Sequence, residues 1–160
     1  MASRTWRGAL AAVVLAGCGP GQSQWQASLA AARAERLVGV WIARLRVDRV
    51  TGDSLPPVTG QIGLTLNEEG RRVAQFGERP TYFGTFDIDL ATAGISAAAA
   101  GIPALTGRLR GDTLELSLGP QSDSPVLLMG ILVGDSVGGR WTAHQRAGAD
   151  RSGSFVLRRH

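Results

Sequence analysis

The most regular feature of the chain is an alternation of hydrophobic and polar residues that runs from about residue 39 to residue 159. A period of two is typical of a β-strand that buries one face and shows the other to water. Glycine, aspartate, proline and serine interrupt the alternation about every 8 to 12 residues, which indicates turns between short strands. The expected inward positions are Trp41, Ala43, Leu45 and Val47; Val58, Gly60, Ile62, Leu64 and Leu66; Tyr82, Phe86, Ile88 and Leu90; Leu105, Gly107 and Leu109; Leu114, Leu116 and Leu118; Val137, Gly139 and Trp141; and Phe155, Leu157 and Arg159.

This succession of strands predicts an all-β fold with eight or nine strands. A meander of antiparallel strands must protect its outer edges, and closing the sheet into a barrel removes those edges. Two Gly-Asp pairs, Gly111-Asp112 and Gly134-Asp135, each lie between two alternating runs and are typical of tight hairpin turns. We therefore expect an antiparallel up-and-down β-barrel.

One short N-terminal helix is expected before the first strand. Ser23 and Gln26 have the spacing of a capping box, which commonly begins a helix. Residues 27–37 are rich in helix-forming residues, with Leu29 and Arg33 at helical spacing. The barrel should thus follow directly after this helix.

Two segments depart from the alternation. Residues 126–133 are apolar on both faces apart from Gly130, so a strand there needs a cover over its outer face. We expect the N-terminal helix to supply that cover, and a protein partner is the alternative. Residues 91–104 are mostly small and include Pro103, which favours a linker over a cap on the barrel mouth.

Composition and charge narrow the range of functions. The chain has 160 residues, of which 44% are hydrophobic and 19% charged, as in a single globular domain. Its 17 basic residues are all arginines, and they are scattered rather than clustered into a run that would follow a phosphate backbone. The formal net charge of +4 falls to +2 if Arg4 and Arg7 are removed with a signal peptide. Nucleic acid is therefore not an expected partner.

The first residues have the pattern of a secretory signal. Arg4 and Arg7 precede the apolar residues 9–16, a run too short to span a bilayer, which needs about 20 residues. The next motif, Leu15-Ala16-Gly17-Cys18, resembles the lipobox of bacterial lipoproteins. In that family the cysteine receives a diacylglycerol and the chain is cleaved before it. The alternative is an ordinary cleaved signal with an incidental cysteine.

The lipobox resemblance implies a domain organisation and a location. Residues 1–17 would be the signal peptide, residues 18–25 the lipidated N-terminus with its tether, and residues 26–160 a single barrel domain preceded by the helix. Cys18 is the only cysteine, so it has no internal disulfide partner and lipidation would explain its presence. Gly19 follows it rather than aspartate, which by the same resemblance favours an outer-membrane lipoprotein that faces the periplasm.

A second resemblance concerns the first strand. Gly39-Val40-Trp41 resembles the Gly-x-Trp signature of the lipocalins, which are β-barrels that bind small apolar molecules. The resemblance implies that Trp41 seals the closed end of the barrel and that an arginine from the last strand lies over it. Arg159 is the matching candidate, and both roles would be structural.

Two motifs formally match the nucleophile sites of hydrolases. Gly134-Asp135-Ser136-Val137-Gly138 has the spacing of a nucleophile elbow, but the residues that follow predict a strand rather than the helix that this site requires. Gly52-Asp53-Ser54-Leu55 resembles the opening block of the GDSL esterases, whose later Asp-x-x-His is missing here. Both segments are better explained as turns, and no catalytic residue is expected.

No metal or cofactor site is predicted. His144 and His160 are the only histidines, which is too few for a closed zinc site with four ligands once Cys18 is committed to lipid. Asp87 and Asp89 share one strand face, but calcium takes six or more oxygen ligands, so a solvated outer face is the simpler interpretation.

These observations favour a non-enzymatic, membrane-anchored lipoprotein that binds or carries a small apolar or amphipathic ligand. Tyr82, Phe86 and Trp141 are the candidate lining residues, because aromatic side chains offer apolar area with a polar handle. The alternative is an envelope assembly or scaffold lipoprotein that works through its surface. Its expected mark is an exposed apolar patch near residues 126–133. A serine esterase built on Ser136 is a remote third possibility.

Overall fold

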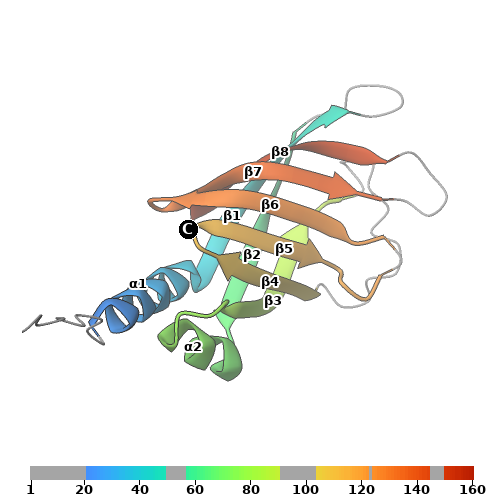
Figure 1. The fold of residues 1–160 in the computed structure, drawn as a ribbon. Helices are drawn as coiled ribbons and strands as arrows, with labels where there is room; N and C mark the ends of the chain where they lie inside the picture. The colour runs from blue at the N-terminus through green and yellow to red at the C-terminus, as the bar shows by residue number, and fades with distance from the viewer. Residues whose placement is uncertain (1–20, 50–56, 91–103, 123, 145–149) are drawn as a thin grey trace, which may run out of the picture.

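The computed structural model describes residues 21–49, 57–90, 104–122, 124–144 and 150–160. Within them, eight antiparallel strands form a closed barrel in sequence order, and the first strand pairs with the last (Figure 1). The prediction of an all-β up-and-down barrel with an N-terminal helix is confirmed. The elements are α1 (Gly21–Leu37), β1 (Gly39–Arg49), β2 (Val58–Leu66), α2 (Glu68–Gln75), β3 (Thr81–Ile88), β4 (Ala104–Arg110), β5 (Thr113–Leu118), β6 (Val126–Val133), β7 (Ser136–Ala143) and β8 (Arg151–Arg159).

The barrel interior is the core of the molecule. The period-two alternation of the sequence places one hydrophobic row of each strand inward, and these rows are buried. The buried residues of the described chain include no charged, amide, serine or threonine side chain. Close approach of strands requires glycine at Gly130, because a Cβ there would lie 2.7 Å from the Phe155 ring and 2.8 Å from the Gly138 carbonyl oxygen. The two predicted Gly-Asp turns are present, with φ of 61° at Gly111 and 59° at Gly134.

Two details of the helices differ from the predictions. The first helix begins at Gly21, so residues 21–25, expected to belong to the tether, are helical and Ser23 lies inside the helix rather than before it. The second helix, α2, was not predicted, because its eight residues include a glycine and only a few apolar positions. Its start has a recognisable signal, since the Asn67 side chain accepts a hydrogen bond from the Gly70 backbone N–H.

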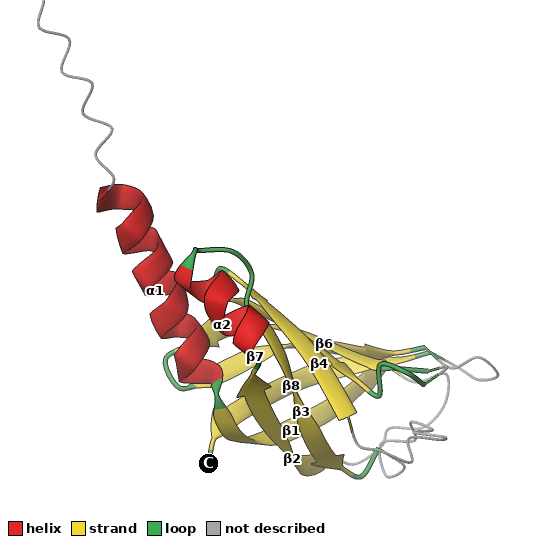
Figure 2. Cartoon of the chain, turned by 90° about the horizontal axis from the view of Figure 1, so that it is seen from below, coloured by secondary structure: helices red, strands yellow, loops and turns green. Residues whose placement is uncertain are grey.

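Both helices lie at one end of the barrel, together with the β4–β5 and β6–β7 turns (Figure 2). We call this the helix end. Residues 50–56, 91–103 and 145–149 lie outside the described residues. Of the predicted linker at 91–104, only Ala104 is described, and it begins β4. No helix among the described residues has the length and hydropathy that crossing a membrane requires.

Candidate functional site

The C-terminal turn of α1 is built into the helix end of the barrel. A helix leaves its last four carbonyl groups without intrahelical partners, and two of them are taken up here by barrel side chains. The Tyr82 hydroxyl donates to the Ala34 carbonyl at 2.8 Å, and the Trp41 indole Nε1–H donates to the Leu37 carbonyl at 2.8 Å. Ala34 and Leu37 are themselves completely buried. The last turn of α1, residues 34–37, therefore closes this end of the barrel, and we call it the plug.

Tyr82 is held in its neutral form by this arrangement. Burial raises the pKa of the phenol well above its ordinary value, because the charged phenolate would lose its hydration. The carboxylate of Glu35 on α1 raises the pKa further through charge repulsion. A neutral phenol keeps its proton for the Ala34 carbonyl, so Tyr82 serves as a structural donor at physiological pH.

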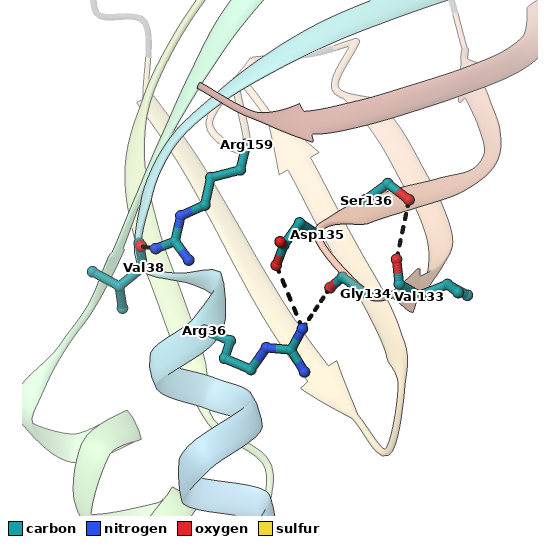
Figure 3. Close-up of polar contacts among 7 residues, drawn as sticks. All are labelled: Arg36, Val38, Val133, Gly134, Asp135, Ser136 and Arg159. Carbon is teal, nitrogen blue, oxygen red and sulfur yellow. Dashed lines mark hydrogen bonds and ion pairs between the residues drawn. The ribbon is translucent and has the colours of Figure 1, made fainter.

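Arginines on α1 connect the plug to both hairpin turns. Arg33 lies 3.2 Å from the Asp112 carboxylate in the β4–β5 turn. Arg36 donates to the Gly134 carbonyl at 2.9 Å and lies 3.4 Å from the Asp135 carboxylate in the β6–β7 turn (Figure 3). These contacts hold the helix across the barrel end. The prediction that α1 covers the outer face of residues 126–133 is therefore wrong.

Trp41 and Arg159, the two residues that the lipocalin resemblance singled out, are neighbours on adjacent strands. They are directly opposite each other in the register of β1 and β8, and Trp41 is buried at the helix end. The Arg159 guanidinium is exposed and donates to the Val38 carbonyl at 2.7 Å, in the connection between α1 and β1 (Figure 3). Stacking of this guanidinium on the indole remains a prediction.

The three predicted ligand-lining residues all face the barrel interior. Tyr82 and Trp141 have no exposed surface and Phe86 is 7% exposed, so no water-sized space touches the first two. Their polar atoms are also engaged, because the Trp141 indole Nε1–H donates to the Arg46 carbonyl at 3.0 Å and the Tyr82 hydroxyl binds α1. These side chains are core residues in this structure, and ligand binding by them remains a prediction.

The outer face of β6 carries a row of exposed hydrophobic side chains, which we call the β6 stripe. Its members are 44% to 69% exposed, while the alternate residues of the same strand are buried in the barrel. Its first and last residues are six positions apart, which is about 20 Å of extended chain. No described helix covers it, since α1 and α2 lie at the barrel end (Figure 1). The stripe consists of Leu127, Met129, Ile131 and Val133.

Neutral and oppositely charged groups flank the β6 stripe. In the strand register, Met129 lies between Glu115 of β5 and Arg140 of β7. Ile131 lies beside Gly138, where an added Cβ would meet no atom within 4 Å, so this side of the stripe is open. The rest of the flank consists of Thr113, Ser117, Ser136 and Thr142.

The serine of the nucleophile-elbow pattern, Ser136, is not near a histidine. Ser136 begins β7 and donates from its hydroxyl to the Val133 carbonyl at 3.1 Å within the hairpin turn (Figure 3). His144 follows the last residue of β7, about 26 Å away along the extended strand, and pairs with Asp150 at 3.1 Å. The two residues therefore do not form a catalytic pair.

Other predicted positions either lie outside the described residues or show no metal site. Cys18 and the segment Gly52-Asp53-Ser54-Leu55 lie outside the described residues. Asp87 is on the solvated outer face of β3, as expected. Among the described residues, no group of three or more histidine, cysteine or acidic side chains is placed to hold a metal ion.

Comparisons with known proteins give no assignment for the chain. No protein-family model matches the sequence, and no curated protein is similar to it.

Proposed function

We propose that this protein is a non-enzymatic, lipid-anchored envelope lipoprotein that docks a partner protein through the β6 stripe. The observation that carries the proposal is the exposure of four consecutive outward hydrophobic side chains on a strand that no described element covers. Exposed apolar surface is unfavourable in water, and a contiguous patch of it on a monomer is typical of an interaction site. The stripe is the mark expected of a scaffold or assembly lipoprotein.

The surroundings of the stripe favour a protein over a lipid surface as its occupant. Protein interfaces commonly have an apolar centre with a polar rim. Here Glu115 and Arg140 flank Met129 with one charge of each sign, and small neutral side chains complete the rim. An anionic bilayer attracts basic residues and would repel Glu115. A partner with an apolar ridge and complementary charges at its sides fits this surface better.

The barrel itself supplies rigidity for such docking. Every β6 residue pairs with β7 along its length, and the inward residues Leu128 and Leu132 anchor the strand in the core. A preorganised strand loses little conformational entropy on binding. The small-ligand hypothesis remains a prediction that no contact among the described residues favours, since Tyr82 and Trp141 are packed and hydrogen-bonded.

The anchor part of the proposal rests on the lipobox resemblance at Cys18, and the helical start at Gly21 leaves only a short chain between them. Cys18→Ser removes the thiol that would carry the lipid, so we expect the protein to move from the membrane to the soluble fraction. Membrane fractionation and flotation of both forms measure this. A Cys18→Ser protein that still floats with membranes would contradict anchoring through this residue.

Site-specific photo-crosslinking in cells tests the docking surface. A benzoylphenylalanine residue at Ile131 should give one discrete protein adduct, whereas the same residue at Thr65, on the exposed face of β2 across the barrel, should give none. Adding Met129→Glu should abolish the Ile131 adduct, because a carboxylate at the centre of the stripe is costly to desolvate and the adjacent Arg140 is already paired with Asp48 at 3.0 Å.

The identity of the crosslinked molecule shows whether a partner protein, a second copy of this chain or a lipid binds the β6 stripe. A single partner found by mass spectrometry and lost with Met129→Glu supports docking of a protein. A dimer of this chain, a lipid adduct, or equal crosslinking from Ile131 and Thr65 would overturn the proposal. Circular dichroism of the Met129→Glu protein serves as the folding control, since Met129 is 58% exposed and its loss should leave the barrel intact.

A further inference from the structure

A second surface feature, independent of the β6 stripe, lies on the outer face of β1 and β8. Register places Ile42 opposite Arg158 and Arg44 opposite Val156, so the two aliphatic residues lie on one diagonal and the two arginines on the other. Diagonal neighbours of this kind have Cα atoms about 7–8 Å apart, which long arginine side chains span easily. The four residues, with Arg159, line a groove of about 320 Å³.

The groove is positively charged without internal compensation. Arg44 and Arg158 have no ion pair or hydrogen bond from their side chains within the described chain. Arg159 bonds only a neutral carbonyl, that of Val38. The acidic residue nearest along β1, Asp48, is already engaged by Arg46 at 3.5 Å and by Arg140 at 3.0 Å. Three guanidinium groups therefore share one hollow that has no acidic side chain in its lining.

The floor of the groove is apolar. Val156 is 40% exposed and Ile42 is half-buried, so aliphatic surface lies between the two diagonal arginines. Planar guanidinium groups bind phosphate through paired N–H donors, and a phosphodiester has two free oxygens that two arginines can share. A free inorganic anion would use the arginines but leave the aliphatic floor in contact with water. An amphiphile uses both.

We propose that this groove binds the headgroup of an anionic phospholipid. The phosphate lies between Arg44 and Arg158, and the first carbons of the lipid contact Ile42 and Val156. A carboxylate-bearing protein segment would satisfy the arginines but gains nothing specific from a floor of two aliphatic side chains. The site goes beyond the docking function proposed for β6 and stands or falls separately from it.

A titration with short-chain lipids tests the site without forming a membrane. The full chain with Cys18→Ser is titrated calorimetrically with dihexanoylphosphatidylglycerol below its micelle concentration, with dihexanoylphosphatidylcholine and with inorganic phosphate. We expect the anionic lipid to bind more tightly than either other probe. The double variant Arg44→Gln/Arg158→Gln should weaken its binding by at least about tenfold, because two charge-assisted hydrogen-bonding groups are lost.

A charge-matched control separates the groove from general electrostatic attraction. Arg72→Gln/Arg108→Gln removes the same two positive charges from α2 and from the outer face of β4, and should change the affinity less than about twofold. Both variants should keep the wild-type circular dichroism spectrum, since all four arginines are exposed.

Four outcomes would overturn the assignment. The first is equal loss of affinity in the two double variants, and the second is binding that survives Arg44→Gln/Arg158→Gln. The third is inorganic phosphate binding as tightly as the lipid, which would mean that the groove binds a free phosphate rather than a lipid headgroup. The fourth is a hexaglutamate peptide binding more tightly than the lipid, which would assign the groove to an acidic protein segment.

Discussion

The outer surface of the barrel divides into two halves that share one interior. On β2 to β5, which we call the polar half, the outward residues are mainly threonine, glutamine and charged side chains, and Phe83 is the exposed large hydrophobic residue. On β6, β7, β8 and β1, which we call the mixed half, the outward residues include exposed hydrophobic side chains, namely the β6 stripe, Val156 and Val40, beside arginines such as Arg44 and Arg158. Both halves bury their alternate residues equally well.

This difference separates what the fold requires from what it does not. The strands of the polar half bury hydrophobic residues on one face and expose threonine on the other. One hydrophobic face is therefore sufficient for a strand of this barrel to pack into the core. The outward hydrophobic residues of β6 therefore have no role in closing the barrel. They expose apolar surface to water and do not belong to the buried core, which is why we assign them to an intermolecular contact.

The largest expected effect tests whether the two halves are equivalent inside. Phe86 on β3 and Phe155 on β8 are the same residue type at buried inward positions of opposite halves. Phe86→Ala and Phe155→Ala should each lower the free energy of unfolding by about 3–5 kcal/mol, through lost burial and the cavity left behind. Chemical denaturation measures both. A cost near zero for one of them would show that its half of the interior is loosely packed.

A smaller effect is expected at the contact between the polar half and the plug. Tyr82→Phe removes the donor to the Ala34 carbonyl and should cost about 1–2 kcal/mol at neutral pH, because a buried carbonyl loses its partner. The pKa of Tyr82 is higher in the folded state than its ordinary value of 10.0 in the unfolded chain. The contribution of Tyr82 to the free energy of unfolding is therefore complete below pH 10 and declines as the pH rises above that value.

The pH dependence gives this prediction its control. Unfolding measured between pH 8 and about pH 11 should show a loss of stability at alkaline pH that is smaller in Tyr82→Phe than in the wild type. Because Tyr82 is the only tyrosine of the chain, no other phenol contributes to that difference. Identical alkaline profiles for the two proteins would mean that the phenol is not held neutral by burial.

The smallest expected effect is on stability at the two outer faces. Two substitutions swap a hydrophobic and a polar residue between these faces: Ile131→Thr in the β6 stripe and Thr106→Ile in the polar half. Each should change the free energy of unfolding by no more than about 0.5 kcal/mol. Thermal unfolding measures this, and Ile131→Thr should also raise solubility. A large destabilisation by Ile131→Thr would mean that the stripe contributes to the fold itself and would weaken the docking proposal.

Much of the barrel could be predicted because its information is local. The alternation within residues 58–66 and the Gly-Asp pairs at 111–112 and 134–135 identify strands and turns from neighbouring residues alone. The prediction that α1 covers residues 126–133 was wrong because it used the local pattern alone. A strand that is apolar on both faces indicates that something covers it, and sequence pattern does not say whether that cover belongs to the same molecule.

The surface sites could not be predicted because they depend on distant pairing. The groove combines Ile42 and Arg44 with Val156 and Arg158, more than 110 residues later, and only the register between β1 and β8 brings them together. The position of α1 similarly depends on its contacts with Asp112 and Asp135. Nothing in the helix sequence indicates whether it packs on a side of the barrel or across its end.

The way in which α1 ends has a mechanical consequence. Its last turn is fastened to β1 through Trp41, to β3 through Tyr82 and to the β6–β7 turn through Arg36. A pull exerted on the chain before Gly21 therefore reaches several strands at once instead of peeling β1 away from its neighbours. The helix acts as a handle that spreads tension over the closed end, so the barrel can be held from its N-terminal side without opening.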